Sequence, residues 1–394
     1  MSGFTIFRII FFALYIGLHC VLLGGLVLEW RRDRKAGGGP ALKKTPAERL
    51  PKVSVIVPVR NETLRIDGLL QSLAVQEYPA AEFIFVDDRS SDETPQKLSQ
   101  FVRDMAGRGG AECRIITLGE NPGPNYKQYA LGRGIEAASG ELFLFTDADC
   151  EVPPHWIFAM ARRMEDEQTG AVIGPVFKKT GGGSFLSFYQ CLDHGVRYLY
   201  LAGISGLGAA GGGFGNNLIL RRKSLDLIGG YESVPFSPTE DAALVSRIRS
   251  HSRHRIRSAI GAGTHVFTGP EKSWGALVNQ TLRWNNGGLF SPDLMTRINF
   301  NYLMISISAG VLAMPLLPFF PGLWPLSFAV VLSMLMNTIA MLCLFRQSLP
   351  KGGVLTILQY IFQCLFTPLW MTLLTLLGFF RVNVNWKGSP IKKN

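Results

Sequence analysis

The sequence predicts an α/β protein with a hydrophobic anchor at its N-terminus and hydrophobic helices at its C-terminus. Three observations predict this: short apolar runs alternate with helical patterns in the middle of the chain, one long apolar stretch precedes them, and three follow. Of the 394 residues, 47% are hydrophobic and 18% are charged, which excludes a disordered protein. The net charge of +11 suits a partner that carries phosphate.

The first apolar stretch, residues 9–28, is long enough to cross a hydrocarbon core of about 30 Å. Basic residues follow at once (Arg31, Arg32, Arg34, Lys35), which predicts a cytoplasmic C-terminal end. A cleaved signal peptide is less favoured, because the apolar core is too long and no small-x-small cleavage site follows it. We expect an anchor over residues 1–30, a linker over 31–50, and an integral protein of the inner or plasma membrane whose central domain is cytoplasmic.

Three apolar segments follow the central domain, over residues 302–320, 323–345 and 354–380. Basic residues predict that the last loop and the tail are both cytoplasmic: Arg346, Lys351, Arg381, Lys387, Lys392 and Lys393. Three full spans would leave the tail on the other side, so we expect residues 354–380 to be re-entrant and bent at Pro368. The expected divisions are membrane segments over 299–381 and a basic cytoplasmic tail over 382–394.

The central part alternates between strand and helix patterns. Short apolar runs predict strands over 53–58, 83–86, 114–117 and 142–145, and helical spacing predicts helices over 63–76, 92–105 and 126–138. This alternation indicates βαβ units and a parallel sheet covered on both faces. Ligands bind beyond the carboxyl ends of such strands.

Charged residues stand at these strand ends: Arg60 and Glu62, Asp87 and Asp88, and Asp147 and Asp149. Clustered carboxylates repel unless a cation or hydrogen-bond donors join them. The D-x-D pattern is spaced for a hard divalent ion that also holds phosphate oxygens. By itself such a loop is more often a solvated turn, but its position after the fourth strand favours the metal-site hypothesis.

Five motifs in order resemble the family 2 glycosyltransferases over about residues 50–290: Val53–Pro58 with Asn61-Glu62, Val86–Asp92, Asp147 with Asp149, Thr239–Asp241, and Gln280-x-x-Arg283-Trp284. The resemblance implies a GT-A fold over 51–298, a nucleotide-sugar donor with UDP-hexose as the default, Mn²⁺ or Mg²⁺, and inversion at the anomeric carbon. The hydrophobic ends and Val384–Gly388 resemble lipid-directed members, such as ceramide glucosyltransferase-like and carotenoid glycosyltransferase-like enzymes. One departure is Arg89, where many members have glycine.

The resemblance implies that Asp87 accepts a hydrogen bond from the nucleotide base, with Pro58, Arg60, Glu62 and Asp92 near the donor. Asp92 could equally cap the helix that follows it.

Lys127 opens a predicted helix and could meet a phosphate, or be an exposed helix lysine. Asp149 is the expected metal ligand, with Asp147 directed toward the sugar or ribose. Mn²⁺ or Mg²⁺ would act there as a Lewis acid on the leaving diphosphate.

Asp241, with Glu240 beside it, is the expected general base for the acceptor hydroxyl. The alternative is that both residues form only the capped first turn of a helix.

Gln280, Arg283 and Trp284 share one helix face. Arginine can pair there with phosphate, and tryptophan offers a flat surface for a sugar or acceptor. The alternative for them is an amphipathic helix on a membrane surface. Residues 184–201 also fit an interfacial amphipathic helix.

These features predict an enzyme that transfers a hexose to the hydroxyl of a lipid or isoprenoid at the bilayer. Two alternatives are a processive polysaccharide synthase and a non-catalytic, membrane-tethered protein that binds nucleotide sugars. No nucleic-acid partner is expected, because the arginine-rich stretch 247–257 lacks the accompanying pattern of stacking aromatic residues. The sequence does not indicate the oligomeric state.

Overall fold

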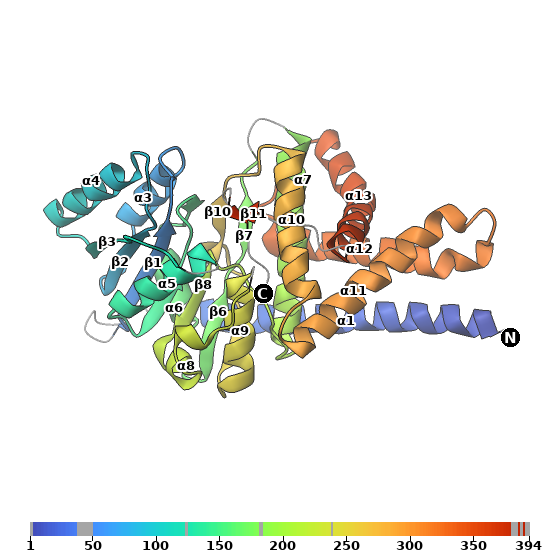
Figure 1. The fold of residues 1–394 in the computed structure, drawn as a ribbon. Helices are drawn as coiled ribbons and strands as arrows, with labels where there is room; N and C mark the ends of the chain where they lie inside the picture. The colour runs from blue at the N-terminus through green and yellow to red at the C-terminus, as the bar shows by residue number, and fades with distance from the viewer. Residues whose placement is uncertain are drawn as a thin grey trace. The chain divides into compact units, whose positions relative to one another are not determined.

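The computed structural model describes residues 3–37, 50–122, 125–180, 184–237, 239–379, 385–386 and 389–390. They form two compact units (Figure 1). The α/β unit comprises residues 29–177 and 210–269, and the helical unit comprises residues 1–28, 178–209 and 270–391. Most of the predicted linker, and Arg381, Lys387, Gly388, Lys392 and Lys393 of the predicted tail, lie outside the described residues.

A seven-stranded sheet forms the centre of the α/β unit, in the order β3-β2-β1-β4-β8-β6-β9. Its strands are β1 (Val53–Val59), β2 (Ala81–Asp87), β3 (Glu112–Thr117), β4 (Leu142–Phe145), β6 (Thr169–Ile173), β8 (Leu218–Arg221) and β9 (Arg255–Ser258). The four predicted strands pair in parallel as β3, β2, β1 and β4, whereas β8 runs antiparallel to both of its neighbours. A small second sheet contains β5 (Cys150–Glu151), β10 (Val266–Thr268) and β7 (Val176–Lys178).

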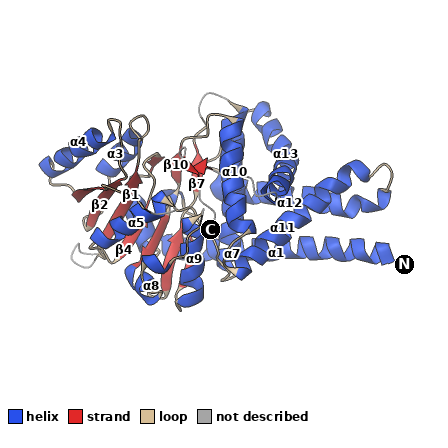
Figure 2. Cartoon of the chain, viewed as in Figure 1, coloured by secondary structure: helices blue, strands red, loops and turns tan. Residues whose placement is uncertain are grey.

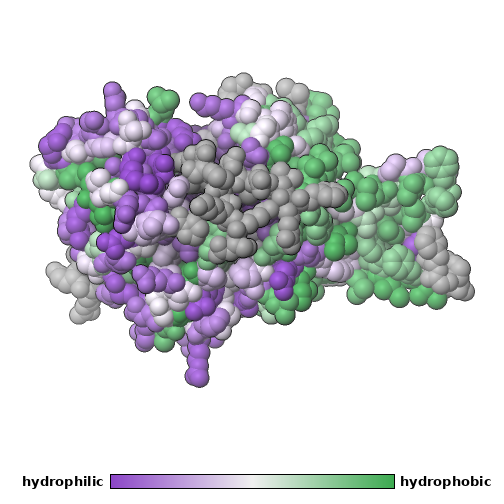
Figure 3. All heavy atoms as spheres, viewed as in Figure 1, coloured by the Kyte–Doolittle hydropathy of each residue, from purple (hydrophilic) through white to green (hydrophobic). Residues whose placement is uncertain are grey.

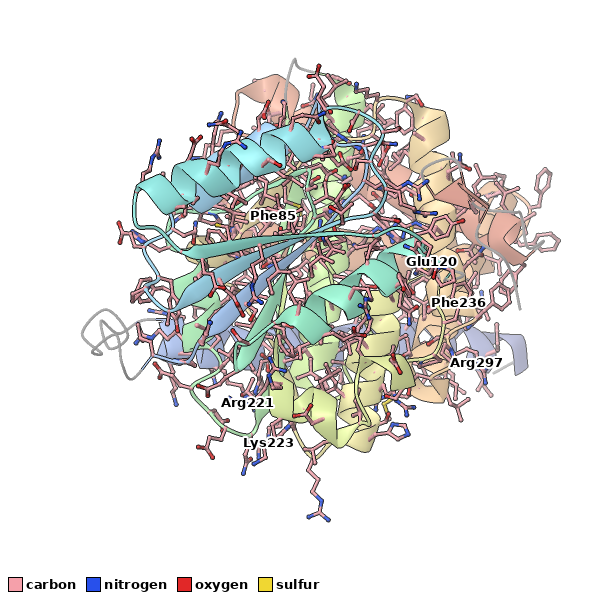
Figure 4. All side chains as sticks on the ribbon, turned by 60° about the vertical axis from the view of Figure 1, so that its left-hand side comes forward. Phe85, Glu120, Arg221, Lys223, Phe236 and Arg297 are labelled. Carbon is pink, nitrogen blue, oxygen red and sulfur yellow. The ribbon has the colours of Figure 1, made fainter. Side chains whose placement is uncertain are left out.

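Helices cover this sheet (Figure 2). They are α3 (Ile66–Ala74), α4 (Thr94–Gly107), α5 (Tyr126–Ala137), α6 (Trp156–Arg162), α8 (Arg222–Leu227) and α9 (Glu240–His251), with 3₁₀ turns η2 (Tyr231–Ser233) and η3 (Ala262–Thr264). Phe85 of β2 lies beneath α4, where its ring meets Phe101 edge-on with centroids 5.6 Å apart (Figure 4). Helix α5 packs so closely on β1 that a methyl group on Gly134 would lie 2.5 Å from Ile56.

The helical unit contains most of α1 (Gly3–Gly37), together with α7 (Phe185–Gly206), α10 (Trp274–Leu289), α11 (Leu294–Ala313), α12 (Trp324–Phe345) and α13 (Val354–Phe379). Short 3₁₀ turns η4 (Met314–Leu316) and η5 (Pro321–Leu323) join α11 to α12, and a hairpin follows, β11 (Asn385–Trp386) with β12 (Ser389–Pro390). In the part of the chain that the structure describes, four helices are long and apolar enough to cross a membrane: Ile6–Ala36, Leu294–Leu316, Pro321–Phe345 and Thr356–Phe379. Hydrophobic side chains dominate the visible surface of these long helices (Figure 3).

Two predictions about helices differ from the structure. Residues 354–379 form one continuous helix with Pro368 inside it, so the predicted re-entrant bend is wrong. Helix α7 buries residues around most of its circumference, which an interfacial amphipathic helix would not do. The structure also places residues 178–209 and 270–298, predicted within the central domain, in the helical unit.

Two buried carboxylates hold the last turns of α1 inside the α/β unit. Glu29 accepts hydrogen bonds from the Ser258 amide (3.0 Å) and from Arg257 (3.4 Å). Asp33 accepts one from the Gly261 amide (2.9 Å) and pairs with Arg163. Residues 31–37, predicted as the start of the linker, therefore continue the helix.

Glu82 of β2 joins the strands on either side of it. It is fully buried, and it accepts hydrogen bonds from Ser54 of β1, from Arg114 of β3 and from the Ser139 amide (2.7 Å) and hydroxyl (2.8 Å). Burial by itself would raise the pKa of Glu82, but these hydrogen bonds outweigh it and lower the pKa to about 2.

We predict that Glu82→Gln lowers the free energy of unfolding by about 2 kcal/mol at pH 7, because it removes a charged hydrogen-bond acceptor. The stabilisation by Glu82 is present above its ordinary pKa of 4.5 and is lost as the pH falls toward 2, so the difference from wild type should narrow between pH 5 and pH 3. Thermal unfolding in detergent measures both the loss of free energy at pH 7 and its change with pH. Glu112→Gln, at an exposed carboxylate that also pairs with Arg114, is the control and should cost little. A difference independent of pH would contradict the assignment.

Candidate functional site

The site of the α/β unit lies where β1, β2 and β4 end and where α5 and α9 begin. Lys127, in the first turn of α5, contacts both the loop after β4 and the start of α9. Its Nζ lies 2.8 Å from Asp147 Oδ1, in the loop after β4, and 3.2 Å from Glu240 Oε1, at the start of α9. Burial opposes its charge, but these carboxylates outweigh burial and raise the pKa of Lys127. The lysine predicted to meet a phosphate or solvent is therefore bound to two carboxylates.

A side-chain cap fixes where Lys127 stands. The Asn125 side chain accepts hydrogen bonds from the amides of Lys127 (3.1 Å) and Gln128 (3.2 Å), which is the preferred way to begin a helix. Its amide group also donates to the Ser237 carbonyl at 3.0 Å. The start of α5 is thus tied to the segment that leads into α9.

Asp241 follows Glu240 in the first turn of α9. Its Oδ2 accepts a hydrogen bond from the Gly215 amide (2.7 Å), and its Oδ1 accepts one from the Ala242 amide (2.8 Å). Desolvation and the neighbouring Glu240 raise the pKa of Asp241 to about 6, although Lys127 and the two amides act in the opposite direction. A carboxylate with this pKa can take up a proton near neutral pH, as a general base must.

Two residues of this cluster were not predicted. Gly215 lies against Asp241, since a methyl group at its Cα would stand 3.1 Å from Asp241 Oδ2, a tight contact that the absence of a side chain avoids. Tyr231 of η2 is buried near enough to Glu240 and Lys127 for both charges to affect its hydroxyl. The glycine-rich stretch 206–215 was a signal for the first, but its sequence does not show which glycine contacts Asp241.

Hydrogen bonds join the loops after β1 and β2. Asp87 is buried, and its Oδ1 accepts a hydrogen bond from the Ser90 amide (3.2 Å). Asp92 accepts hydrogen bonds from the Thr94 (3.0 Å) and Thr63 (3.1 Å) amides. Desolvation would raise the pKa of Asp92, but its hydrogen bonds from Thr94 and Thr63 lower it to about 2. Asp92 thus joins the two loops and accepts a hydrogen bond from the first residue of α4.

The other predicted residues of these loops lie beside them. Glu62 is buried and pairs with Arg65 at 2.8 Å, in the turn that leads into α3. Pro58 lies in β1, in register with Val86 of β2. Both positions are at the carboxyl edge of the sheet, where the sequence places them.

Two arginines meet at Tyr126, next to Lys127. The guanidinium groups of Arg60 and Arg89 lie 5.3 and 5.2 Å from the centre of the Tyr126 ring, and both pair with Asp88, at 3.4 and 2.8 Å. Arg89 has a φ of 56°, a left-handed conformation that costs a residue other than glycine about 1–2 kcal/mol. The arginine at this position therefore places a second cation beside Asp88, in a backbone conformation that glycine adopts without strain.

Asp147 and Asp149 are the carboxylates that fit a divalent cation. Their side chains keep 31% and 26% exposure, so both can reach a ligand. Asp149 has one weak ion pair, with Arg65 at 3.7 Å. Among the described residues no group of three or more His, Cys, Asp or Glu side chains is placed to hold a metal. One or two carboxylates suffice for Mg²⁺ when phosphate oxygens and water complete its shell.

The Gln280, Arg283 and Trp284 motif lies on α10 in the helical unit. Gln280 donates a hydrogen bond to Glu271 at 2.7 Å. The Trp284 ring lies 5.3 Å from the His194 ring and 5.1 Å from the Arg197 guanidinium, both on α7. The predicted sharing of one helix face is found, and α10 is not among the helices apolar enough to span a membrane.

Comparison with known proteins identifies the family of this chain. The family model described as glycosyl transferase family 21 matches residues 13–392. The beta-monoglucosyldiacylglycerol synthase of Trichormus variabilis is 26% identical over 201 residues, which are 50% of this chain and 41% of that protein. The 4,4'-diaponeurosporenoate glycosyltransferase of Staphylococcus haemolyticus is 35% identical over 112 residues, which are 28% of this chain and 27% of that protein. The alignments thus span less than half of these two relatives.

A solved structure supports the fold. The mannosyltransferase of Pyrobaculum calidifontis, in complex with GDP-Man and Mn²⁺, covers 91% of this chain and 99% of its own, with a TM-score of 0.51 and 20% identity. The predicted GT-A architecture, with an N-terminal apolar helix and C-terminal hydrophobic helices, is confirmed. The predicted resemblance to glycosyltransferases is confirmed as well.

We predict that Lys127→Met destabilises the α/β unit more at high pH than at low pH. Lys127 lowers the pKa of the neighbouring Asp241, so without the ammonium group ionising Asp241 in the folded state becomes more costly as the pH increases. The loss should be small at pH 5 and about 2–3 kcal/mol at pH 8, measured by thermal unfolding in detergent. Lys97→Met, at an exposed pair with Asp67, is the matched control. A loss that is equal at both pH values would show that Lys127 does not neutralise these carboxylates.

Proposed function

The chain belongs to glycosyl transferase family 21, and on this basis we propose that it transfers a hexose from a nucleotide-sugar donor to the hydroxyl group of a lipid or isoprenoid. The observation that carries the proposal is Asp241, a carboxylate whose pKa is raised to about 6 beside the Lys127, Asp147 and Glu240 cluster. Two relatives are named for products or substrates that are lipids, a glucosyldiacylglycerol and a diaponeurosporenoate. Four apolar helices support a reaction at a bilayer.

The donor would lie across the carboxyl ends of β1, β2 and β4. Asp87 would receive the base, since a buried carboxylate can accept hydrogen bonds from ring N–H groups. Arg60 and Arg89 hold positive charge near the place that a diphosphate would occupy. The Gln280, Arg283 and Trp284 motif on α10 would bind phosphate through Arg283 and a sugar or acceptor through Trp284.

A divalent cation, Mn²⁺ or Mg²⁺, would be held by Asp149 with help from Asp147, and it would stabilise the charge of the leaving diphosphate. The other charges of the site are balanced by side chains of the protein. Lys127 neutralises Asp147 and Glu240, and so permits an anionic donor to enter an otherwise acidic pocket.

Asp241 would act as the base in a single displacement. The acceptor oxygen attacks the anomeric carbon from the face opposite the diphosphate, and its proton moves to an Asp241 oxygen. The bond from the anomeric carbon to the diphosphate oxygen breaks, and the nucleoside diphosphate leaves with the bonding pair. This displacement inverts the anomeric configuration.

The proposal is tested with purified full-length protein in detergent, UDP-glucose and other nucleotide hexoses, and a lipid extract. We expect release of nucleoside diphosphate together with a lipid whose mass has increased by one hexose, and loss of both when EDTA removes divalent cations. Mass analysis separates the alternatives: a long glycan indicates a polysaccharide synthase, and donor binding without turnover indicates a non-catalytic protein. Turnover unaffected by EDTA would contradict the metal assignment alone.

We predict that Asp241→Asn lowers kcat by about 10³-fold while donor binding is retained, because the amide cannot accept the proton. For the wild-type enzyme, kcat/KM should fall below pH 6, where Asp241 becomes protonated, and should level off above it. Initial rates between pH 5 and pH 8 measure this limb. Asp226→Asn, the same substitution at an exposed site on α8, should leave the profile unchanged. An intact acid limb and rate in the Asp241 variant would refute its role as base.

A further inference from the structure

The arginine-rich stretch 247–257 is not used by the proposed reaction. Its first arginine serves the fold, since Arg247 on α9 is half-buried and donates a hydrogen bond to Ser233 at 3.0 Å. Its last two arginines are turned outward on β9. Arg255 and Arg257 stand two residues apart and so lie on the same face of the strand, Arg255 exposed and Arg257 half-buried, whereas the residues that alternate with them are buried.

Strand β9 is an edge of the seven-stranded sheet, and the last turns of α1 lie beside it. Glu29 accepts a hydrogen bond from the Ser258 amide of β9, and Asp33 accepts one from the Gly261 amide just beyond the strand. Glu29 and Asp33 are four residues apart, so they share one face of the helix. Both the position and the rotation of this end of α1 are therefore fixed against β9.

The opposite face of these turns is basic. With about 3.6 residues per turn, Arg31, Arg34 and Lys35 fall on the side away from the two buried carboxylates. All three are exposed. The Arg34 guanidinium lies 5.1 Å from the centre of the Trp30 ring, so an aromatic side chain accompanies this row of cations.

The cations of α1 and β9 meet at one carboxylate oxygen. Glu29 Oε1 lies 2.8 Å from a guanidinium nitrogen of Arg32 and 3.4 Å from one of Arg257. Burial lowers the pKa of Arg257, and the charges of Arg32 and Arg255 lower it further against the effect of Glu29, as expected for clustered cations. We define the basic collar as Arg31, Arg32, Arg34, Lys35, Arg255 and Arg257.

Membrane insertion alone does not explain this collar. Basic residues directly after an apolar helix orient it during insertion, which accounts for those of α1. Arg255 and Arg257 lie far along the sequence and reach α1 only when the α/β unit has folded. Packing requires Arg257, which pairs with the buried Glu29, but it does not require the exposed charge of Arg255.

The collar begins at the depth of lipid head groups. Helix α1 is continuous from Gly3 to Gly37, and its apolar run ends at Leu28, one residue before Glu29. At a rise of about 1.5 Å per residue, the basic turns lie within about 10 Å of the end of that run. The polar head groups occupy about 5–8 Å on each side of the hydrocarbon core. The collar is thus continuous with the segment expected to cross the bilayer.

The charge of the collar selects an anionic partner. The exposed Asp166, in the acidic stretch 165–167, acts on Arg257 in the opposite direction, but the cations outnumber these carboxylates. Guanidinium groups pair with phosphate oxygens, and a group of basic residues on the cytoplasmic side of an apolar helix is typical of proteins that bind anionic lipid.

We propose that the basic collar binds the phosphate head groups of anionic phospholipids in the membrane that α1 enters. The lipid is bound here as part of a surface and takes no part in sugar transfer, so the proposal goes beyond the proposed function. Its consequence is that the β9 edge of the α/β unit is held at an anionic leaflet by its own arginines as well as by α1.

The test uses the full-length protein in nanodiscs of phosphatidylcholine, with and without phosphatidylglycerol. Hydrogen–deuterium exchange reports on the amides of residues 252–263. We expect phosphatidylglycerol to slow their exchange, and about 1 M NaCl to abolish the effect by screening. Arg255→Gln should need about fivefold more phosphatidylglycerol for half of the protection, whereas Arg255→Lys, which keeps the charge, should behave as wild type.

Arg108→Gln is the matched control. It removes one exposed arginine at the end of α4, which packs on β3 at the opposite edge of the sheet from β9. This variant should keep the wild-type dependence on phosphatidylglycerol, and all variants should keep the wild-type melting temperature, because the substituted side chains are exposed.

Three outcomes would overturn the proposal: equal exchange in the two kinds of nanodisc, wild-type dependence on phosphatidylglycerol in Arg255→Gln, or equal protection by glycerol phosphate added to phosphatidylcholine nanodiscs. The last outcome would indicate a site for a free anion.

Native mass spectrometry gives a second, independent measurement. From mixed micelles with equal amounts of the two lipids, the wild-type protein should retain more phosphatidylglycerol than Arg255→Gln does, and equal retention would contradict the assignment. Neither experiment contains a nucleotide sugar, so their results do not depend on whether the proposed transfer occurs.

Discussion

The repulsion among carboxylates at one edge of the sheet is the constraint on which the site depends. Asp147 and Glu240 come from distant parts of the sequence, and the Lys127 ammonium group lies between them at 2.8 and 3.2 Å. That ammonium group can stand there only because α5 begins where Asn125 caps it, and because α5 lies close against β1 at Gly134. The two ion pairs of Lys127 thus depend on the helix cap at Asn125 and on the close helix–strand contact at Gly134.

Lys127 does not neutralise the three carboxylates of this cluster equally, and the difference suits one of them to act as a base. Asp147 and Glu240 contact the cation directly, whereas Asp241 accepts hydrogen bonds from two backbone amides. Amides stabilise an anion less than a cation does, so desolvation and Glu240 keep the pKa of Asp241 raised. A carboxylate paired directly with lysine would be a weak base, and one without any donor would destabilise the fold.

Local patterns in the sequence predict the parallel half of the sheet, because each strand is a short apolar run and each helix has its own spacing of apolar residues. They do not predict the antiparallel insertion of β8, which depends on pairing partners far apart in the chain. Nor do they predict the left-handed Arg89, since nothing in the identity of an arginine indicates positive φ and only Asp88 and Tyr126 explain it. Among the glycines of 206–215, only the folded structure shows that Gly215 contacts Asp241. Hydropathy identifies α13 but does not show that it continues through Pro368.

Mean hydropathy also hides what the long helices contain. A segment that served only as an anchor would gain nothing from buried Gln363 and Thr375, since each must find a hydrogen-bond partner where water is scarce. Helix α10 carries the Gln280, Arg283 and Trp284 motif and, at the intervening and next positions, the fully buried Thr281 and Asn285. The motif and these buried polar positions therefore belong to one helix. The helical unit thus contains buried polar side chains that membrane anchoring alone does not require.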